Sequence, residues 1–178
     1  GEYELLPTRI DFSRGNIRLA GSYGEGIKVQ SRLDSLDIAM IDAFVPGLGV
    51  NGRATGSLDF SQANSAAFPR ADARLQIANF SRTTAVSVSQ PVDVNFVGKL
   101  LPDGGEARAV MRRRGTVIGR MNASLNPLPP GSGSWTTRLL SAPLGGGIRY
   151  NGPADTLFSF AGQPDQRLSG PIGVAADF

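Results

Sequence analysis

The chain has 178 residues, of which 40% are hydrophobic and 19% charged, and it contains 23 glycines and 12 prolines. This composition is typical of one folded domain with many turns, and it is too apolar for a disordered chain. The sequence has no cysteine and no histidine. This excludes disulfides, thiolate nucleophiles, the usual zinc and iron–sulfur sites, and histidine acid–base catalysis.

The charge of the chain is mild and well spread. The formal net charge is +3, sixteen of the eighteen basic residues are arginine, and the cations cluster only at residues 112–114. Nucleic-acid binding usually needs a basic stripe interleaved with aromatic side chains, so we expect no nucleic-acid partner. The chain has no run of about 18 apolar residues, so we expect no membrane-spanning helix.

Hydrophobic residues recur at every second position over most of the chain. This alternation predicts strands with one apolar and one wet face, which is the habit of antiparallel sheets. The alternating segments are 17–21, 27–33, 75–77, 92–100, 107–111, 121–125, 135–139, 148–150 and 172–178. With a further strand near residues 53–60, we expect roughly ten or eleven strands in an all-β fold.

Turn-forming residues separate these segments. Residues 24–26, 103–105 and 114–115 are glycine-containing and stand at hairpin spacing. Longer breaks are expected at residues 61–69 and 126–134, the second of which contains three prolines. This is the strand spacing expected of an all-β fold.

Two short segments have helical rather than alternating spacing. In residues 37–45 the apolar positions suit a helix, with Asp37 as its N-cap. In residues 153–161, Pro153 suits the first helical turn and Gly162 the end. We therefore expect two short helices beside the sheet.

Such a sheet exposes a large apolar face that something must cover. Burying one large apolar side chain is worth about 1.5–3 kcal/mol, and two short helices are too small to shield ten strands. The face is covered by a second sheet, by closure into a barrel, or by a curled trough that other molecules, such as acyl chains, fill. Many inward positions are small, which favours the trough: Ala54, Ala73, Ala107, Ala109, Ala123 and Ala176.

Residues 36–60, LDIAMIDAFVPGLGVNGRATGSLDF, resemble the TamB family. This family forms the inner-membrane half of the translocation and assembly module and is related to the AsmA-like bridge-type lipid transfer proteins. Residues 9–21, 146–155 and 168–172 are also similar to its repeated units. The sequence shows no signal peptide and stops in mid-pattern, so we expect residues 1–178 to be one β-taco segment from the middle of a longer protein.

The resemblance implies a U-shaped sheet with an apolar interior that spans the periplasm and is tethered to the inner membrane through a part absent from this chain. It implies transport of phospholipid to the outer membrane and help in outer-membrane protein assembly and autotransporter secretion. The implied partners are phospholipid acyl chains and, for the full-length protein, an outer-membrane barrel of the TamA type. It implies no enzyme activity, no catalytic residue, no cofactor and no metal.

The residues expected to line the groove are apolar members of the alternating segments. Their role is contact with hydrocarbon, which is non-directional and roughly proportional to area. They are Ile17, Leu19, Ile27, Val29, Leu75, Ile77, Val94, Phe96, Leu125 and Leu139.

Other functional classes remain open at this point. A soluble β-sandwich interaction module and a chaperone that holds nascent outer-membrane β-strands both suit the alternation. A transmembrane β-barrel suits it less, because one tryptophan and three tyrosines are too few for two aromatic girdles.

Three motifs suggest other chemistry, but each has a simpler interpretation. Residues 47–52 match G-x-G-x-x-G, yet a helix precedes them and a strand follows, which is the reverse of a dinucleotide site. The arginines at 112–114 are interpreted as the solvated end of a hairpin. Asp59, Asp72 and Asp93 stand at polar alternating positions of strands, which makes a glycosidase pair an unfavoured interpretation.

Overall fold

The computed structural model describes residues 1–43, 46–85, 88–160 and 170–178. It contains ten strands and three short helices. The elements are β1 (Tyr3–Asp11), β2 (Asn16–Tyr23), β3 (Ile27–Asp37), η1 (Ile38–Ala43), β4 (Val50–Gln62), β5 (Arg70–Arg82), β6 (Val92–Leu101), β7 (Gly104–Arg113), β8 (Thr116–Leu125), α1 (Trp135–Leu140), β9 (Leu144–Pro153), α2 (Ala154–Phe160) and β10 (Pro171–Asp177).

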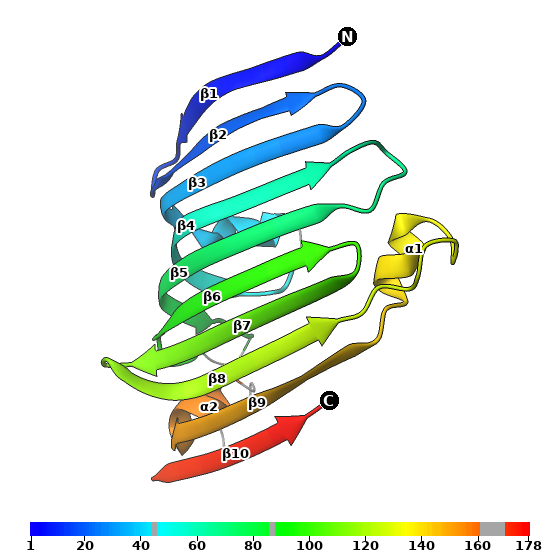
Figure 1. Ribbon diagram of the computed structural model, residues 1–178. Coiled ribbons are helices and arrows are strands. Elements are labelled where there is room, and N and C mark those ends of the chain that lie inside the picture. The colour runs from blue at the N-terminus through cyan, green and yellow to red at the C-terminus, as the bar shows by residue number, and fades with distance from the viewer. Residues whose placement is uncertain (44–45, 86–87, 161–169) are drawn as a thin grey trace.

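All ten strands form one antiparallel sheet in which each strand pairs with the next along the chain (Figure 1). The prediction of an all-β antiparallel sheet is therefore confirmed. The sheet does not close into a barrel, because β1 and β10 are its two edges. The part of the chain that the structure describes forms this one sheet rather than two facing sheets. At about 4.8 Å between strands, the sheet extends about 43 Å from edge to edge.

The register separates apolar from polar side chains over the whole sheet. Residues directly opposite each other share a face. Leu19, Ser31 and Leu58 stand opposite one another on β2, β3 and β4, and this row continues through β5 to β9 with small residues. Arg18 and Arg32 stand opposite each other on the other side. We call the two sides the trough face and the outer face.

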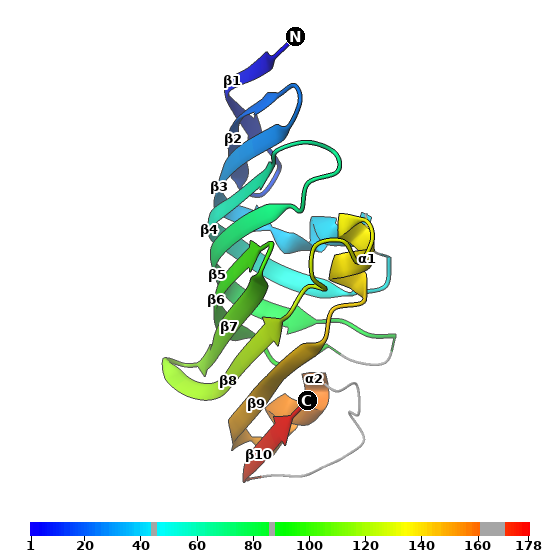
Figure 2. The ribbon, with the colours of Figure 1, turned by 45° about the vertical axis from the view of Figure 1, so that its right-hand side comes forward.

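Because the strands follow one another directly, every connection lies at one of two rims. The hairpin rim holds residues 24–26, 63–69, 102–103 and the segment 126–143, which includes α1. The insert rim holds the other connections, with η1 and α2 among them. All three helices lie on the same side of the curled sheet (Figure 2).

The buried core is small and lies mostly along the insert rim, with Phe68 as a buried residue of the hairpin rim. Val92, Ile118 and Tyr150 form its main cluster, against which Leu157 and Phe160 of α2 pack. A second buried group surrounds η1 and consists of Leu36, Ile38 and Ala54. The inserts therefore cover only one margin of the trough face.

The two predicted helices exist, with shifted ends. η1 is a 3-10 helix over Ile38–Ala43, and the Asp37 carboxylate accepts a hydrogen bond from the Ala39 amide at 3.0 Å, as expected of a cap. Residues 44–45, also predicted as helical, lie outside the described residues. Pro153 ends β9, so α2 begins one residue later than predicted, and Ala161 and Gly162 lie outside the described residues.

The strand predicted over residues 135–139 is wrong, because these residues form α1. The Ser134 hydroxyl accepts a hydrogen bond from the Thr137 amide and caps the helix. The buried Arg138 then donates to the carbonyl oxygens of Leu128 at 2.6 Å and Pro102 at 3.1 Å. None of the described helices is long and apolar enough to cross a membrane.

Glycine is required on the trough face where strands approach closely. Gly56 has φ of +145°, and a Cβ there would collide with the backbone carbonyl oxygen of Arg74 on β5. Gly173 on β10 has open space around its Cα. The two glycines therefore differ in what a side chain would meet.

We expect Gly56→Ala to lower the free energy of unfolding by about 1–3 kcal/mol, because it strains the backbone and pushes β5 away from β4. Gly173→Ala is the matched control and is expected to change stability by less than about 0.5 kcal/mol. Urea unfolding of the two variants checks this. Equal losses in both would contradict the close approach at Gly56.

The core cluster supplies a pH-dependent test. Burial raises the pKa of the Tyr150 phenol, whose hydroxyl donates to the carbonyl oxygen of Pro153 at 2.6 Å. The unfolded chain releases this proton at lower pH than the folded one, so stability should fall as the pH rises through the usual tyrosine range. In an absorbance titration of phenolate, the step that Tyr150→Phe removes should lie above that range. A step inside the range would contradict the burial of Tyr150.

Candidate functional site

The trough face is the candidate site, and it holds nine of the ten residues expected to line a groove. Leu139 is the exception, because it lies on α1 and not on a strand. The other nine share the trough face through the cross-strand register: Ile17, Leu19, Ile27, Val29, Leu75, Ile77, Val94, Phe96 and Leu125.

A line of small residues runs along the middle of this face, perpendicular to the strands. We call it the floor line, and its members stand directly opposite one another on β5 to β9. They are Ala73, Gly98, Ala107, Ala123 and Gly146. Over these five strands the floor line is about 19 Å long.

Most residues that border the floor line are large, and the small exceptions are Ala71, Gly105 and Ala109. Towards the hairpin rim the bordering row contains Leu100, Leu125 and Leu144. Towards the insert rim it contains Phe96 and Met121, along with other apolar side chains. The two rows are four residues apart along each strand, which is about 13 Å. The result is a furrow with a shallow, apolar floor, and the ring of Phe96 forms part of that floor because it lies 2.9 Å from where a Gly98 Cβ would stand.

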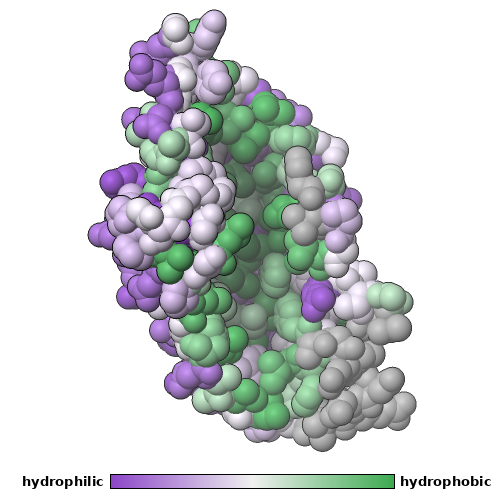
Figure 3. All heavy atoms as spheres, turned by 90° about the vertical axis from the view of Figure 1, so that its right-hand side faces the viewer, coloured by the Kyte–Doolittle hydropathy of each residue, from purple (hydrophilic) through white to green (hydrophobic). Residues whose placement is uncertain are grey.

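Exposure changes across the trough face. Beside the insert rim, Val92 is 2% and Tyr150 is 6% exposed. Towards the hairpin rim, Leu58 is 45%, Phe60 is 37% and Leu144 is 59% exposed. The space-filling view shows the result as a hydrophobic hollow that runs between the two rims (Figure 3).

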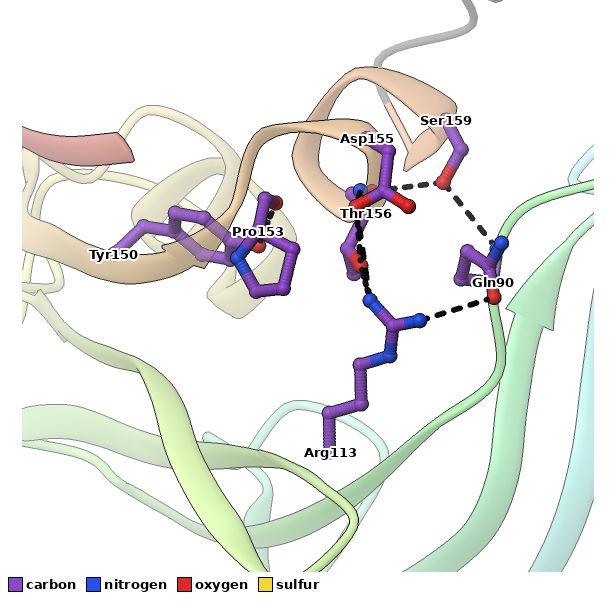
Figure 4. A network of polar contacts seen from close by, with 7 residues as sticks. All are labelled: Gln90, Arg113, Tyr150, Pro153, Asp155, Thr156 and Ser159. Atoms are coloured by element: carbon purple, nitrogen blue, oxygen red, sulfur yellow. Dashed lines mark hydrogen bonds and ion pairs between the residues drawn. The ribbon is translucent and has the colours of Figure 1, made fainter. Parts of the chain in front are cut away.

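A polar network fixes α2 as the wall on the insert rim (Figure 4). The Arg113 guanidinium donates to the Thr156 hydroxyl at 2.6 Å and to the Gln90 side chain at 3.5 Å, and it lies 3.6 Å from the Asp155 carboxylate. The Ser159 hydroxyl accepts a hydrogen bond from the backbone N–H of Gln90 at 3.3 Å and donates one to the backbone carbonyl oxygen of Thr156 at 2.7 Å. Thr156 is fully buried, so this network ties α2 to β7 and to the segment before β6.

Sequence reasoning missed the role of Arg113. The interpretation of residues 112–114 as a solvated hairpin end fits Arg114, which is exposed in the β7–β8 turn. It is wrong for Arg113, whose side chain is only 21% exposed and faces α2. Its partners lie 23 and 43 residues away in the chain, and no local pattern marks them.

The acidic residues considered for catalysis lie on the outer face. Asp59 pairs with Arg32 at 2.9 Å, Asp72 lies 3.9 Å from Arg74, and Asp93 accepts from the Asn79 amide. Within the described ranges, no three carboxylates gather to hold a metal ion. Of the G-x-G-x-x-G match, residues 47–49 lie in the predicted turn, and residues 50–52 already belong to β4, which begins three residues earlier than predicted.

Comparisons of the chain with protein-family models, with curated proteins and with solved structures found no match. The likeness to the TamB family therefore rests on the sequence alone. The sheet and its trough face are described from the structure of this chain itself and do not depend on a similar protein.

The exposure gradient predicts how the trough face tolerates charge. We expect Leu58→Arg to cost less than about 1 kcal/mol of stability, because the long side chain can keep its guanidinium in water. Val92→Arg places the same charge in the closed margin and should cost at least about 3 kcal/mol or prevent folding. Thermal unfolding followed by circular dichroism compares the two variants. A Leu58→Arg protein as unstable as Val92→Arg would show that this part of the face is covered.

Proposed function

We propose that this chain is a segment of a lipid conduit, in which the trough shields phospholipid acyl chains from water. The observation that carries this proposal is the apolar face that stays open along the hairpin rim, with a furrow of small residues at its centre. Each methylene moved from water into such a surface is worth about 0.8 kcal/mol, so ten buried methylenes supply about 8 kcal/mol. An acyl chain is therefore a suitable occupant of the furrow.

The shape of the trough suits passage as well as binding. The sheet that carries this face ends in the edge strands β1 and β10, so no further strand of the described sheet closes either end of the trough (Figure 1). Hydrophobic contact has no preferred direction, so a chain moves along the furrow without breaking specific bonds. The polar head group stays outside the furrow, near a rim.

The resemblance of residues 36–60 to the TamB family supports a location and a pathway. On this basis the segment belongs to a periplasmic protein tethered to the inner membrane through a part absent from this chain. It carries phospholipid to the outer membrane and supports outer-membrane protein assembly with a TamA-type barrel. Its role is contact, without catalysis or a cofactor.

A second candidate is a chaperone that holds nascent outer-membrane β-strands. The observation that favours it is that β1 and β10 each leave one edge unpaired within the described sheet. An extended polypeptide can add to such an edge through backbone hydrogen bonds. This candidate predicts peptide rather than lipid as the molecule captured at the sheet.

Site-specific photo-crosslinking separates the two faces. Leu58 on the trough face is 45% exposed and Val97 on the outer face is 50% exposed, so the two positions match in exposure and apolar character. With a photoreactive amino acid at each position, we expect cellular phospholipid to be captured at least about tenfold more at Leu58, because only that side chain borders the furrow. Mass spectrometry of the adducts measures the yield.

Three outcomes decide between the candidates. Phospholipid adducts at Leu58 alone support the lipid conduit. Peptide adducts at Leu58 with no lipid favour the chaperone. Equal lipid capture at both positions would show unspecific contact with membranes and overturn the proposal.

A further inference from the structure

A small pocket lies on the hairpin rim, directly beside the trough face. It has a volume of about 320 Å³ and is more enclosed than the wider hollow next to it. Tyr23, Ile27 and Gln62 line it, and these three residues stand opposite one another in the outermost row of the trough face. Glu25 of the β2–β3 turn and Trp135 of α1 complete the wall. We call this site the rim pocket.

The fold holds Trp135 firmly at this place. Its indole N–H donates to the carbonyl oxygen of Ser65 at 3.2 Å, which ties α1 to the β4–β5 connection. One turn later, the Arg138 guanidinium lies 4.8 Å above the ring of Phe68 and donates to two carbonyl oxygens. Figure 1 shows α1 beside the turns of the hairpin rim. The indole is only half-buried, so the ring is held in place while part of its surface remains accessible to a ligand.

The side chains of the rim pocket suit a cation. The faces of Trp and Tyr rings attract ammonium groups, with Trp the strongest, and such aromatic sites are the usual means of binding quaternary ammonium. Glu25 adds a negative charge and makes no ion pair or side-chain hydrogen bond with the part of the chain that the structure describes. Two aromatic rings and a free carboxylate therefore meet in one small enclosure.

Positive charge lies on the other side of the same turn. The wider neighbouring hollow has a volume of about 840 Å³ and shares Glu25 and Gln62 with the rim pocket. Lys28 and Arg70 also line it. Both stand in the outer-face register, opposite Ser22 and Ser61, so this basic site lies across the rim from the trough face.

We propose that the rim pocket binds the ammonium end of an amphiphile's head group while the alkyl chain of the same molecule lies in the trough. The inference rests on the proposed function, because it names the amphiphile class that the trough accepts. Glu25, Tyr23 and Trp135 contact the ammonium.

Trp135 is the only tryptophan of the chain, so its fluorescence reports directly on the pocket. The protein is titrated with phosphocholine, which has no alkyl chain, and with dodecylphosphocholine, dodecyl phosphate and dodecyl maltoside below their micelle concentrations. We expect phosphocholine to change the emission with millimolar affinity and dodecylphosphocholine to bind at least about a hundredfold more tightly, because its chain adds buried methylenes. Dodecyl phosphate and dodecyl maltoside should bind at least about fivefold more weakly than dodecylphosphocholine.

Two substitutions in the rim pocket, compared with a Glu→Gln control elsewhere, test whether the binding of phosphocholine takes place there. Glu25→Gln and Tyr23→Leu should each weaken phosphocholine binding by about fivefold and bring dodecylphosphocholine close to dodecyl maltoside. Glu106→Gln is the control, because Glu106 stands on the outer face of β7 and lines neither hollow. It should leave both affinities unchanged.

The outcomes separate this inference from the proposed function. If phosphocholine leaves the emission unchanged and the three dodecyl compounds bind equally, the rim pocket is overturned and the trough stands. If phosphocholine binds and Glu25→Gln weakens it, but the alkyl chain adds no affinity, the rim pocket stands and the lipid conduit fails. Tighter binding of dodecyl phosphate than of dodecylphosphocholine would assign the site to a plain anion and overturn the inference.

Discussion

The main constraint on this structure is a large apolar sheet face that the protein covers only in part. Ten strands place every second side chain on this face, and the inserts at one rim bury Val92, Ile118 and Tyr150, while large apolar residues such as Leu58 and Leu144 stay exposed towards the opposite rim. Leaving large apolar side chains in water costs about 1.5–3 kcal/mol each. A fold that keeps such a face open is therefore suited to a hydrocarbon ligand, which removes this cost when it binds.

The stability of the sheet has to come from elsewhere. Backbone pairing between consecutive strands is continuous from β1 to β10, and the narrow core along the insert rim adds side-chain packing. The ion pairs of the outer face contribute little, since Arg32 and Asp59, for example, are both well exposed. In the Arg149–Asp177 pair the arginine lowers the pKa of the Asp177 carboxyl, yet both groups are open to solvent. The polar outer face keeps the sheet solvated, while backbone pairing between the strands and side-chain packing along the insert rim stabilise it.

The two-residue period of hydrophobicity predicts much of the fold, because alternate residues of a strand lie on opposite faces of the sheet. This is why nine of the ten expected groove residues lie on the trough face. The same argument fails at residues 135–139, where five alternating residues are too few to distinguish a strand from a helix. There, the Ser134 cap and the distant carbonyl partners of Arg138 decide for the helix. The closed wall at α2 also escapes sequence reasoning, since it depends on Arg113 meeting Thr156 across 43 residues.

Small residues at the centre of the trough have a consequence for movement along it. A conduit works only if no position holds its cargo much more strongly than the next, because each 1.4 kcal/mol of extra affinity lengthens the stay about tenfold. From β5 to β9 the floor line presents an alanine or a glycine on every strand, and most flanking positions carry larger apolar side chains, except Ala71, Gly105 and Ala109. Successive steps of an acyl chain across these strands meet similar amounts of apolar surface, so their binding energies are similar. The glycines and alanines that make the strands look weakly hydrophobic are thus what keeps the surface even.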